Sequence, residues 1–205
     1  MQHYYTVMLG DLFIMAQKKV STADGCIALT VFLLMVSQFV ARISDAQAIE
    51  EAPQQEQELL REVFPEADVF SSKSGKLPHY KAYAHRKEAG LNELLGFVFM
   101  TNEVEPEEWA YSSEIEALVG LTTDGIITKV KMIDHFEPFG YFSIDPPEFV
   151  EQFTGKSILD PFEEGRDIDA VTRATITVEG AARVIRKAAR QIVRQHLANQ
   201  KRAEE

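Results

Sequence analysis

Cysteine is almost absent from this sequence, in which Cys26 is the only one among 205 residues. A single thiol excludes a disulfide framework, a zinc cage built of cysteines, a protein-ligated iron–sulfur cluster and a CxxCH haem site. Histidine is scarce as well: the five histidines are scattered along the chain and contain no HExxH pair. Any redox chemistry in this chain therefore needs an organic cofactor or a histidine-rich metal site.

Positive charge and glycine-rich phosphate loops are also lacking. The 21 basic residues are outnumbered by 32 acidic ones, which gives a formal net charge of −11. Binding a nucleic-acid backbone requires clustered positive charge, so we expect no nucleic-acid partner. An acidic surface instead suits a soluble carrier that docks on basic patches of other proteins. Neither GxGxxG nor GxxxxGKS/T occurs, so a nucleotide would have to be held in another way.

Long hydrophobic runs are limited to residues 26–41, and this run is short for a membrane span. Lys18 and Lys19 precede the run. Residues 46–48 (Ala-Gln-Ala) follow it with small residues at the two positions that a signal peptidase inspects. These features predict export, and they favour a cleaved signal peptide over an uncleaved membrane anchor.

The same features divide the chain into a leader over residues 1–48 and a mature domain over residues 49–205. Translation from Met15 would give a leader of more ordinary length. The expected location is the periplasm or the outer face of the cytoplasmic membrane, with membrane contact only through an uncleaved leader.

The mature chain predicts one α+β domain: an antiparallel sheet with flanking helices and a long C-terminal amphipathic helix. The expected elements are a polar helix at 52–63, strands at 77–85, 94–100, 115–121 and 126–133, a short helix at 146–153, and a last helix from Val178 to about Leu197. Asp124-Gly125 supplies the turn of the hairpin. In its second arm, strict alternation would put Ile127 on one face and Val130 and Met132 on the other.

The last helix has one apolar stripe at helical spacing. Its members are residues 178, 181, 182, 185, 188, 189, 192, 193 and 197. Five cations fall largely off this stripe: Arg183, Arg186, Lys187, Arg190 and Arg194. We interpret them mainly as a solvated face, with docking of a partner as the alternative.

The residues that carry chemistry lie immediately before this helix, in the segment 169–177 (DAVTRATIT). Its three threonines stand where the first N–H groups of a helix have no internal partner. Helix capping by Thr175 or Thr177, with Glu179 complementing the helix dipole, is the ordinary explanation. The same N–H groups would also hold a phosphate, to which Arg173 would add a charge-assisted hydrogen bond.

This segment resembles the D-x-x-S/T-G-A-T flavinylation motif of the FMN-binding domain family. That domain occurs in periplasmic flavin subunits of the sodium-pumping quinone reductase and of Rnf-type complexes, and in the regulator of nitrous-oxide reductase expression. The resemblance implies that a flavin transferase moves FMN from FAD onto Thr175. The product would be a phosphoester on this threonine, and the protein would in that sense be a phosphoprotein. Asp169, Thr172 and Ala174 occupy their motif positions, whereas Arg173 stands where the family has glycine.

Three further segments support the resemblance, which covers roughly residues 64–195. Residues 135–140 (HFEPFG) are similar to the H-x-E-T-P-G segment that lies against the flavin, with Phe139 inserted as in the nitrous-oxide-regulator branch. Residues 153–156 (FTGK) are similar to F-x-G-K, and residues 110–113 (AYSS) echo G-Y-x-G. The cofactor-binding residues that follow are Thr175, Asp169, Thr172, Arg173, Ala174, Thr177, His135, Glu137, Pro138 and Gly140.

In this site His135 and Glu137 are expected to offer polar contacts to the flavin edge, and Pro138, Phe139 and Tyr141 an apolar wall. A strand-end turn with satisfied side chains is the alternative for residues 135–141. We find no catalytic base, no substrate pocket and no metal site in the sequence. The function implied is an extracytoplasmic flavoprotein with covalent FMN that acts in electron transfer, with redox partner proteins in the cell envelope. The alternatives are a flavin-containing regulatory or assembly module, and a flavin reductase with its own substrate.

Overall fold

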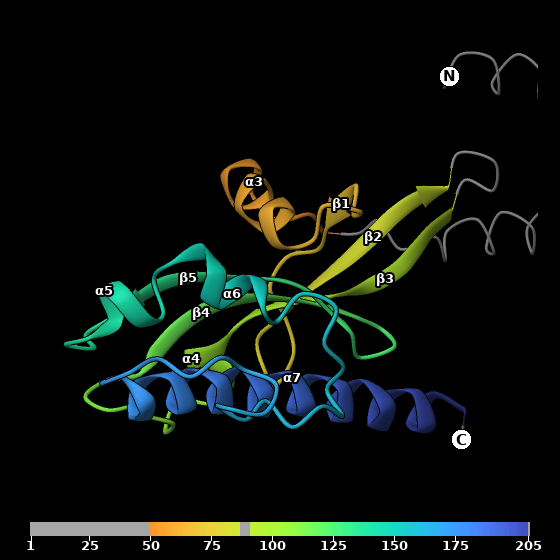
Figure 1. The fold of residues 1–205 in the computed structure, drawn as a ribbon. Helices are drawn as coiled ribbons and strands as arrows, with labels where there is room; N and C mark the ends of the chain where they lie inside the picture. The colour runs from red at the N-terminus through yellow and green to blue at the C-terminus, as the bar shows by residue number, and fades with distance from the viewer. Residues whose placement is uncertain (1–49, 87–90, 205) are drawn as a thin grey trace, which may run out of the picture. The chain divides into compact units, whose positions relative to one another are not determined.

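A computed structural model of the protein describes residues 50–86 and 91–204 (Figure 1). The predicted leader and the alternative start at Met15 lie outside the described residues. The elements in chain order are α3 (Gln54–Val63), β1 (Val69–Phe70), β2 (Tyr80–Arg86), β3 (Leu91–Met100), α4 (Thr101–Val104), β4 (Ile115–Thr122), β5 (Ile127–His135), α5 (Gly140–Ser143), α6 (Pro147–Glu151) and α7 (Thr175–Glu204). The five strands form one antiparallel sheet in sequence order, which confirms the α+β prediction.

The sheet is covered on both faces, by α7 on one side and by α3 on the other (Figure 1). In β3, Phe97 and Phe99 belong to the core under α7, whereas Val98 belongs to the core under α3. Because residues 96–99 of β3 and 117–121 of β4 are buried on both faces, these stretches read as continuous apolar runs and not as an alternation.

The hairpin between β4 and β5 turns at Gly125, whose φ is +78° and whose N–H donates to the Thr122 carbonyl at 3.0 Å. Next to the turn the register shifts: Gly120 pairs with Lys129 but Leu121 pairs with Ile127, so Thr128 is an extra residue. This bulge brings Ile127 and Val130 into the same core. The prediction that they lie on opposite faces is therefore wrong.

Helix α7 begins three residues earlier than predicted and runs on to Glu204. Its stripe is buried from Val178 to Val193, as expected, but Leu197 is 50% exposed. The assignment of Leu197 to the stripe is wrong because the buried cluster ends at Val193, which leaves the last turns of the helix with no core beneath them.

Four of the five cations noted in the predicted helix bind other parts of the same chain. Arg183 (Nε to Oε2, 3.1 Å) and Lys187 both pair with the Glu108 carboxylate. Arg186 donates to the carbonyl of Pro161, and Arg190 donates to the carbonyls of Ile158 and Asp160. These four side chains are partly exposed, as a solvated face predicts, and they also fasten α7 to two loops.

Among residues 50–86 and 91–204, no helix combines the length and the apolar character that a bilayer crossing requires.

Candidate functional site

The segment before α7 turns sharply over residues 171–174. The Ala174 N–H donates to the Val171 carbonyl at 3.0 Å, and Arg173, the third residue of the turn, has a φ of +73°. A positive φ at the third position alone is the signature of a type II turn, which favours glycine there. A non-glycine residue in this region costs about 1 kcal/mol. The positive φ of this turn explains why the resembled motif has glycine at this position. In the present chain Arg173 adopts the same φ and the backbone is strained there.

The approach to this turn is held by the Asp167 carboxylate. It accepts hydrogen bonds from the N–H groups of Phe162 (3.1 Å) and Glu163 (2.7 Å) and pairs with the Lys156 ammonium at 3.2 Å. Burial raises the pKa of Asp167, but the Glu163 N–H and Lys156 outweigh burial and hold the pKa below its ordinary value. The lysine of the 153–156 segment therefore supports the loop and does not line the site.

The first turn of α7 presents free backbone donors. Val178 is the first residue of the helix whose N–H donates to a carbonyl one turn earlier, that of Ala174, at 2.9 Å. The N–H groups of Thr175, Ile176 and Thr177 donate to no other residue in the part of the chain that the structure describes. Neither Thr175 nor Thr177 caps the helix with its hydroxyl within that part of the chain. The start of α7 is therefore a place where an anion would be held by N–H groups and the helix dipole.

The three threonines near this helix start differ in accessibility. The Thr177 side chain is buried (2% exposed) and its hydroxyl donates to Glu137 Oε2 at 2.8 Å. Thr172 is exposed but lies outside the hollow described below, whereas Thr175 is exposed and lines it. Of the three hydroxyls, that of Thr175 alone is both open to solvent and next to the free N–H groups.

Glu137 is buried (6% exposed) and joins two segments that are far apart in sequence. Its Oε1 accepts from three successive N–H groups, those of Tyr111 (3.1 Å), Ser112 (2.8 Å) and Ser113 (3.0 Å), and its Oε2 accepts from Thr177. Burial raises the pKa of Glu137, but these hydrogen bonds, led by the Ser112 N–H and the Thr177 hydroxyl, lower it below the ordinary value. Glu137 thus fixes the 111–113 loop to the first turn of α7.

His135 contacts Glu137 and Gly140 of the same segment. Its Nδ1 accepts from the Glu137 N–H at 3.2 Å, so the ring proton is on Nε2, which donates to Asp145 Oδ1 at 2.7 Å. The ring packs directly on the Cα of Gly140, where any side chain would collide with it. His135 and Gly140 therefore position the 135–140 segment.

A hollow of about 300 Å³ opens at the start of α7. It is lined by Tyr111, Phe139, Arg173, Ala174, Thr175, Ile176 and Thr177. Four of the predicted cofactor-binding residues are among these, together with Phe139 of the predicted wall. The other six do not line it: Asp169, Thr172, His135, Glu137, Pro138 and Gly140.

Two sequence expectations about the hollow need adjustment. Tyr141 is 72% exposed, packs edge-on to Phe142 at 5.0 Å and is not part of the lining. Tyr111 and Ile176 line the hollow although neither was among the expected residues. The echo of G-Y-x-G around Tyr111 was the available signal, whereas nothing in the sequence distinguished Ile176 from other apolar residues of the helix.

These features define an α+β protein that can hold a phosphate at a helix start, beside aromatic side chains. Residues 110–190 match the family model described as the FMN-binding domain. This part of the chain thus belongs to the FMN-binding domain family, as its motifs indicated, and the protein is a flavin-binding protein with FMN as its cofactor. The match spans all the residues of the hollow. No curated protein matched the chain.

The strained turn yields a stability prediction. Arg173→Gly relieves the positive φ, so we expect the free energy of unfolding to rise by about 0.5–1 kcal/mol, since this backbone region suits glycine. Urea unfolding of the two proteins measures the difference. Arg194→Gly, at an exposed position inside α7, is the matched control and should cost about 1 kcal/mol because glycine weakens a helix interior. If Arg173→Gly loses as much stability as the control does, the backbone at Arg173 is not strained.

A second prediction concerns the close approach of α7 to the loop that carries Tyr111. A Cβ on Gly180 would lie 2.5 Å from the Cα and the Cβ of Ala110. Gly180→Ala would normally stabilise a helix, but here the loop must move, so we expect a loss of about 1–3 kcal/mol in the free energy of unfolding. Thermal unfolding followed by circular dichroism checks the sign. A gain in stability would show that the loop yields at no cost.

Proposed function

We propose that this protein carries FMN covalently, as a phosphodiester on Thr175, and that it transfers electrons outside the cytoplasmic membrane. The observation that carries the proposal is the position of the Thr175 hydroxyl. It is exposed, it belongs to the first residue of α7, and it lies beside three N–H groups that have no acceptor in the described chain.

Attachment requires an outside enzyme. A threonine hydroxyl is a weak nucleophile, and within the described residues no histidine or carboxylate is hydrogen-bonded to Thr175 to activate it. A flavin transferase would form the bond between Thr175 Oγ1 and the FMN phosphorus while the pyrophosphate bond of FAD breaks. AMP leaves with the bridging oxygen, and the hydroxyl proton is released. The exposure of Thr175 is what such an enzyme needs.

Once attached, the phosphodiester has a site ready for it. The free N–H groups of the first turn and the helix dipole would hold its negative charge, and Arg173 would add a charge-assisted hydrogen bond. The side chains of Tyr111, Phe139 and Ile176 offer apolar surface for the ring. The flavin supplies the redox chemistry, and the protein fixes its position and its surroundings.

A docking surface for a redox partner lies next to this site. The exposed rings of Trp109 and Phe136 adjoin a hollow of about 170 Å³, which is also lined by Glu114, Glu116 and Asp134. Exposed aromatic side chains are typical of interfaces, and carboxylates around them favour a partner with a basic surface. We propose that redox proteins of the cell envelope dock here.

An extracytoplasmic location is supported by the leader features of residues 1–48. We propose the periplasm or the outer face of the cytoplasmic membrane, with membrane contact only where the leader stays uncleaved. A covalent bond is useful there because flavin that dissociates outside the membrane cannot be replaced from the cytoplasmic pool.

The function is tested by replacing the chromosomal gene with a Thr175→Val version. If the protein is an electron carrier, the strain loses electron flux through the envelope chain while the partner proteins keep their normal abundance. Thr154→Val, at an exposed threonine outside both the motif and the hollow, is the matched control and should leave the flux unchanged. Unaltered flux in the Thr175→Val strain would contradict electron transfer, and a fall in partner abundance would point to a regulatory or assembly module.

A further inference from the structure

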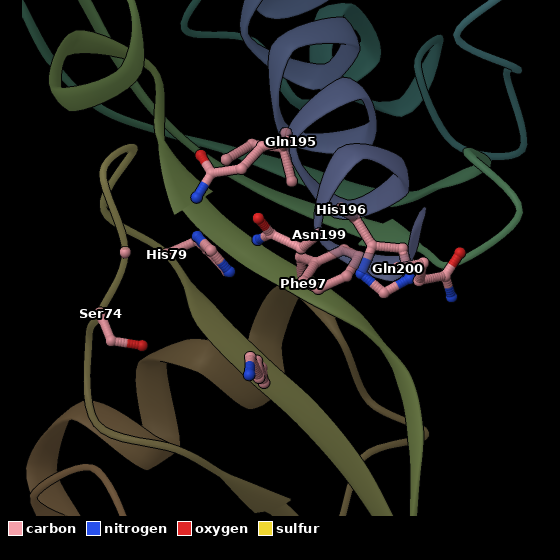
Figure 2. Close-up of a pocket in the computed structure, with 10 residues that line it drawn as sticks. Ser74, His79, Phe97, Gln195, His196, Asn199 and Gln200 are labelled. Atoms are coloured by element: carbon pink, nitrogen blue, oxygen red, sulfur yellow. The ribbon is translucent and has the colours of Figure 1, made fainter. Parts of the chain in front are cut away.

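The C-terminal end of α7 faces strand β3 and the loop before β2 across a hollow of about 330 Å³ (Figure 2). His196, on this part of the helix, is 21 residues after Thr175, which is roughly 30 Å along the helix axis. The core beneath α7 ends at Val193, and beyond it Leu197 is 50% exposed. The last turns of α7 are therefore held by contacts that are separate from the core and from the flavin site.

Two histidines from different elements meet there at one buried ring. His79, in the loop before β2, packs edge-on to Phe97 with 5.4 Å between ring centroids. His196, on α7, packs against the same ring at 4.8 Å and an angle of 58°. Figure 2 shows Phe97 between the two histidines. Phe97 is 1% exposed, so the two histidine rings help to cover an apolar side chain of the sheet.

Hydrogen bonds add a second link between the helix end and the loop. The Leu77 N–H donates to Gln195 Oε1 at 3.3 Å, which is the one hydrogen bond from residues 194–202 to another element within the described chain. The Leu77 carbonyl accepts from His79 Nδ1–H at 2.8 Å. Because Nδ1 carries the proton of the neutral His79 ring, any further proton adds at Nε2.

The surroundings of both histidines disfavour added positive charge. Among the ten residues that line the hollow, Lys81 of β2 is a cation, none is acidic, and those from the loop, β3 and α7 other than the two histidines carry no charge. Burial lowers the pKa of His79 despite the Leu77 carbonyl, and Lys81 and His196 lower it further. Burial and Lys81 likewise lower the pKa of His196. Both rings are therefore neutral near pH 7.

We propose that the end of α7 is a pH-sensitive latch, which is closed at neutral pH and opens in acid. Protons added to His79 and His196 would place them with Lys81 as three positive charges around Phe97, where no lining carboxylate offsets them. Release of the helix end after Val193 lets water solvate these charges. Opening also uncovers Phe97, so acid exposes an apolar surface at this end of the domain. The latch does not depend on whether flavin is bound.

The direction of the pH effect follows from the lowered pKa values. The opened state binds protons more readily than the closed state, because in the opened state both histidines return toward their ordinary pKa of 6.5. The contribution that keeps the latch closed is therefore fully present above pH 6.5 and is lost as the pH falls from 6.5 toward the pKa values of the closed state.

The test is hydrogen exchange of the purified full chain, followed by mass spectrometry at about pH 7.5 and about pH 5 and corrected for the intrinsic pH dependence of amide exchange. The protection of residues 194–200 should fall at least about threefold at the lower pH. The protection of residues 178–190, which lie over the core, should change little. The lower pH is still above 4.5, the ordinary pKa of Glu137, so protonation of that carboxylate contributes little.

A double variant with His79→Gln and His196→Gln keeps polar side chains that cannot take up a proton, so its protection should be the same at both pH values. Lys81→Met removes the neighbouring cation and should make the pH effect smaller. His85→Gln is the matched control: His85 is an exposed histidine of β2 that bonds to Asn92 at 3.0 Å, and its loss should leave the pH effect intact.

Circular dichroism at neutral pH shows whether each variant is folded. If the double variant is not, His196→Gln alone, at a half-buried position, should still reduce the pH effect. The proposal is overturned if the protection of residues 194–200 is the same at both pH values in the unaltered protein, or if it falls equally along the whole of α7. It is also overturned if the folded histidine variants respond to acid as the unaltered protein does.

Discussion

Replacing Thr175 with valine is expected to abolish flavin incorporation when the protein is produced together with a flavin transferase. Valine keeps the shape of the side chain but has no hydroxyl to join to phosphorus. The unaltered protein should be yellow and should gain the mass of FMN less one water. The Thr175→Val variant should be colourless and unmodified. Visible absorbance and intact-mass analysis of the purified proteins measure both effects.

Two other threonines provide controls for this result. Thr154→Val should retain the flavin, because Thr154 is exposed, lies outside the hollow and is not part of the 169–175 motif. Thr177→Val should retain the Thr175 hydroxyl but lose the buried hydrogen bond to Glu137, which costs about 1–2 kcal/mol of stability. Flavin bound to Thr175→Val with the full mass adduct would show that another residue carries the ester.

The second large effect is expected at Glu137. Glu137→Ala leaves three backbone N–H groups and the Thr177 hydroxyl without their acceptor in a buried place. We expect the free energy of unfolding to fall by about 3–5 kcal/mol, comparable to breaking a buried charged pair. For a chain of this size the melting temperature would fall by about 10 °C. Glu107→Ala, at an exposed position, should change the stability by less than about 0.5 kcal/mol.

The same carboxylate predicts how stability depends on pH. The pKa of Glu137 is lowered in the folded protein, so the unfolded chain binds a proton more readily. This contribution to stability is present above the unfolded pKa, near 4.5, and is lost as the pH falls through the folded pKa. Urea unfolding between neutral and acid pH should therefore show a smaller decline for Glu137→Gln than for the unaltered protein. Equal declines would mean that Glu137 has no such role.

Local sequence patterns were sufficient for most of the fold. The run around Phe97 predicted β3, Asp124-Gly125 predicted the hairpin, and the helical stripe predicted α7. The bulge at Thr128 was not predictable, because it depends on how β5 pairs with β4 and not on the residues of β5 alone. Leu197 was misassigned for a related reason: its periodicity continues past the point where the core ends.

The candidate site was predictable in part. Its motif placed Thr175 and its neighbours at the start of the last helix, and the departure at Arg173 marked a position with positive φ. The contacts of Glu137 were not predictable, because its partners are backbone N–H groups about 25 residues earlier in the chain, and a sequence does not show where such groups point. The contacts that the cations of α7 make with carbonyl oxygens of distant loops were not predictable for the same reason.

The most direct measurement is fragment mass analysis of the protein isolated from its native cell envelope. We predict that the peptide containing Thr175 carries the mass of FMN less one water, and that fragmentation places this mass on Thr175 itself. An unmodified Thr175 in the native protein would contradict the account of the helix start as the attachment site.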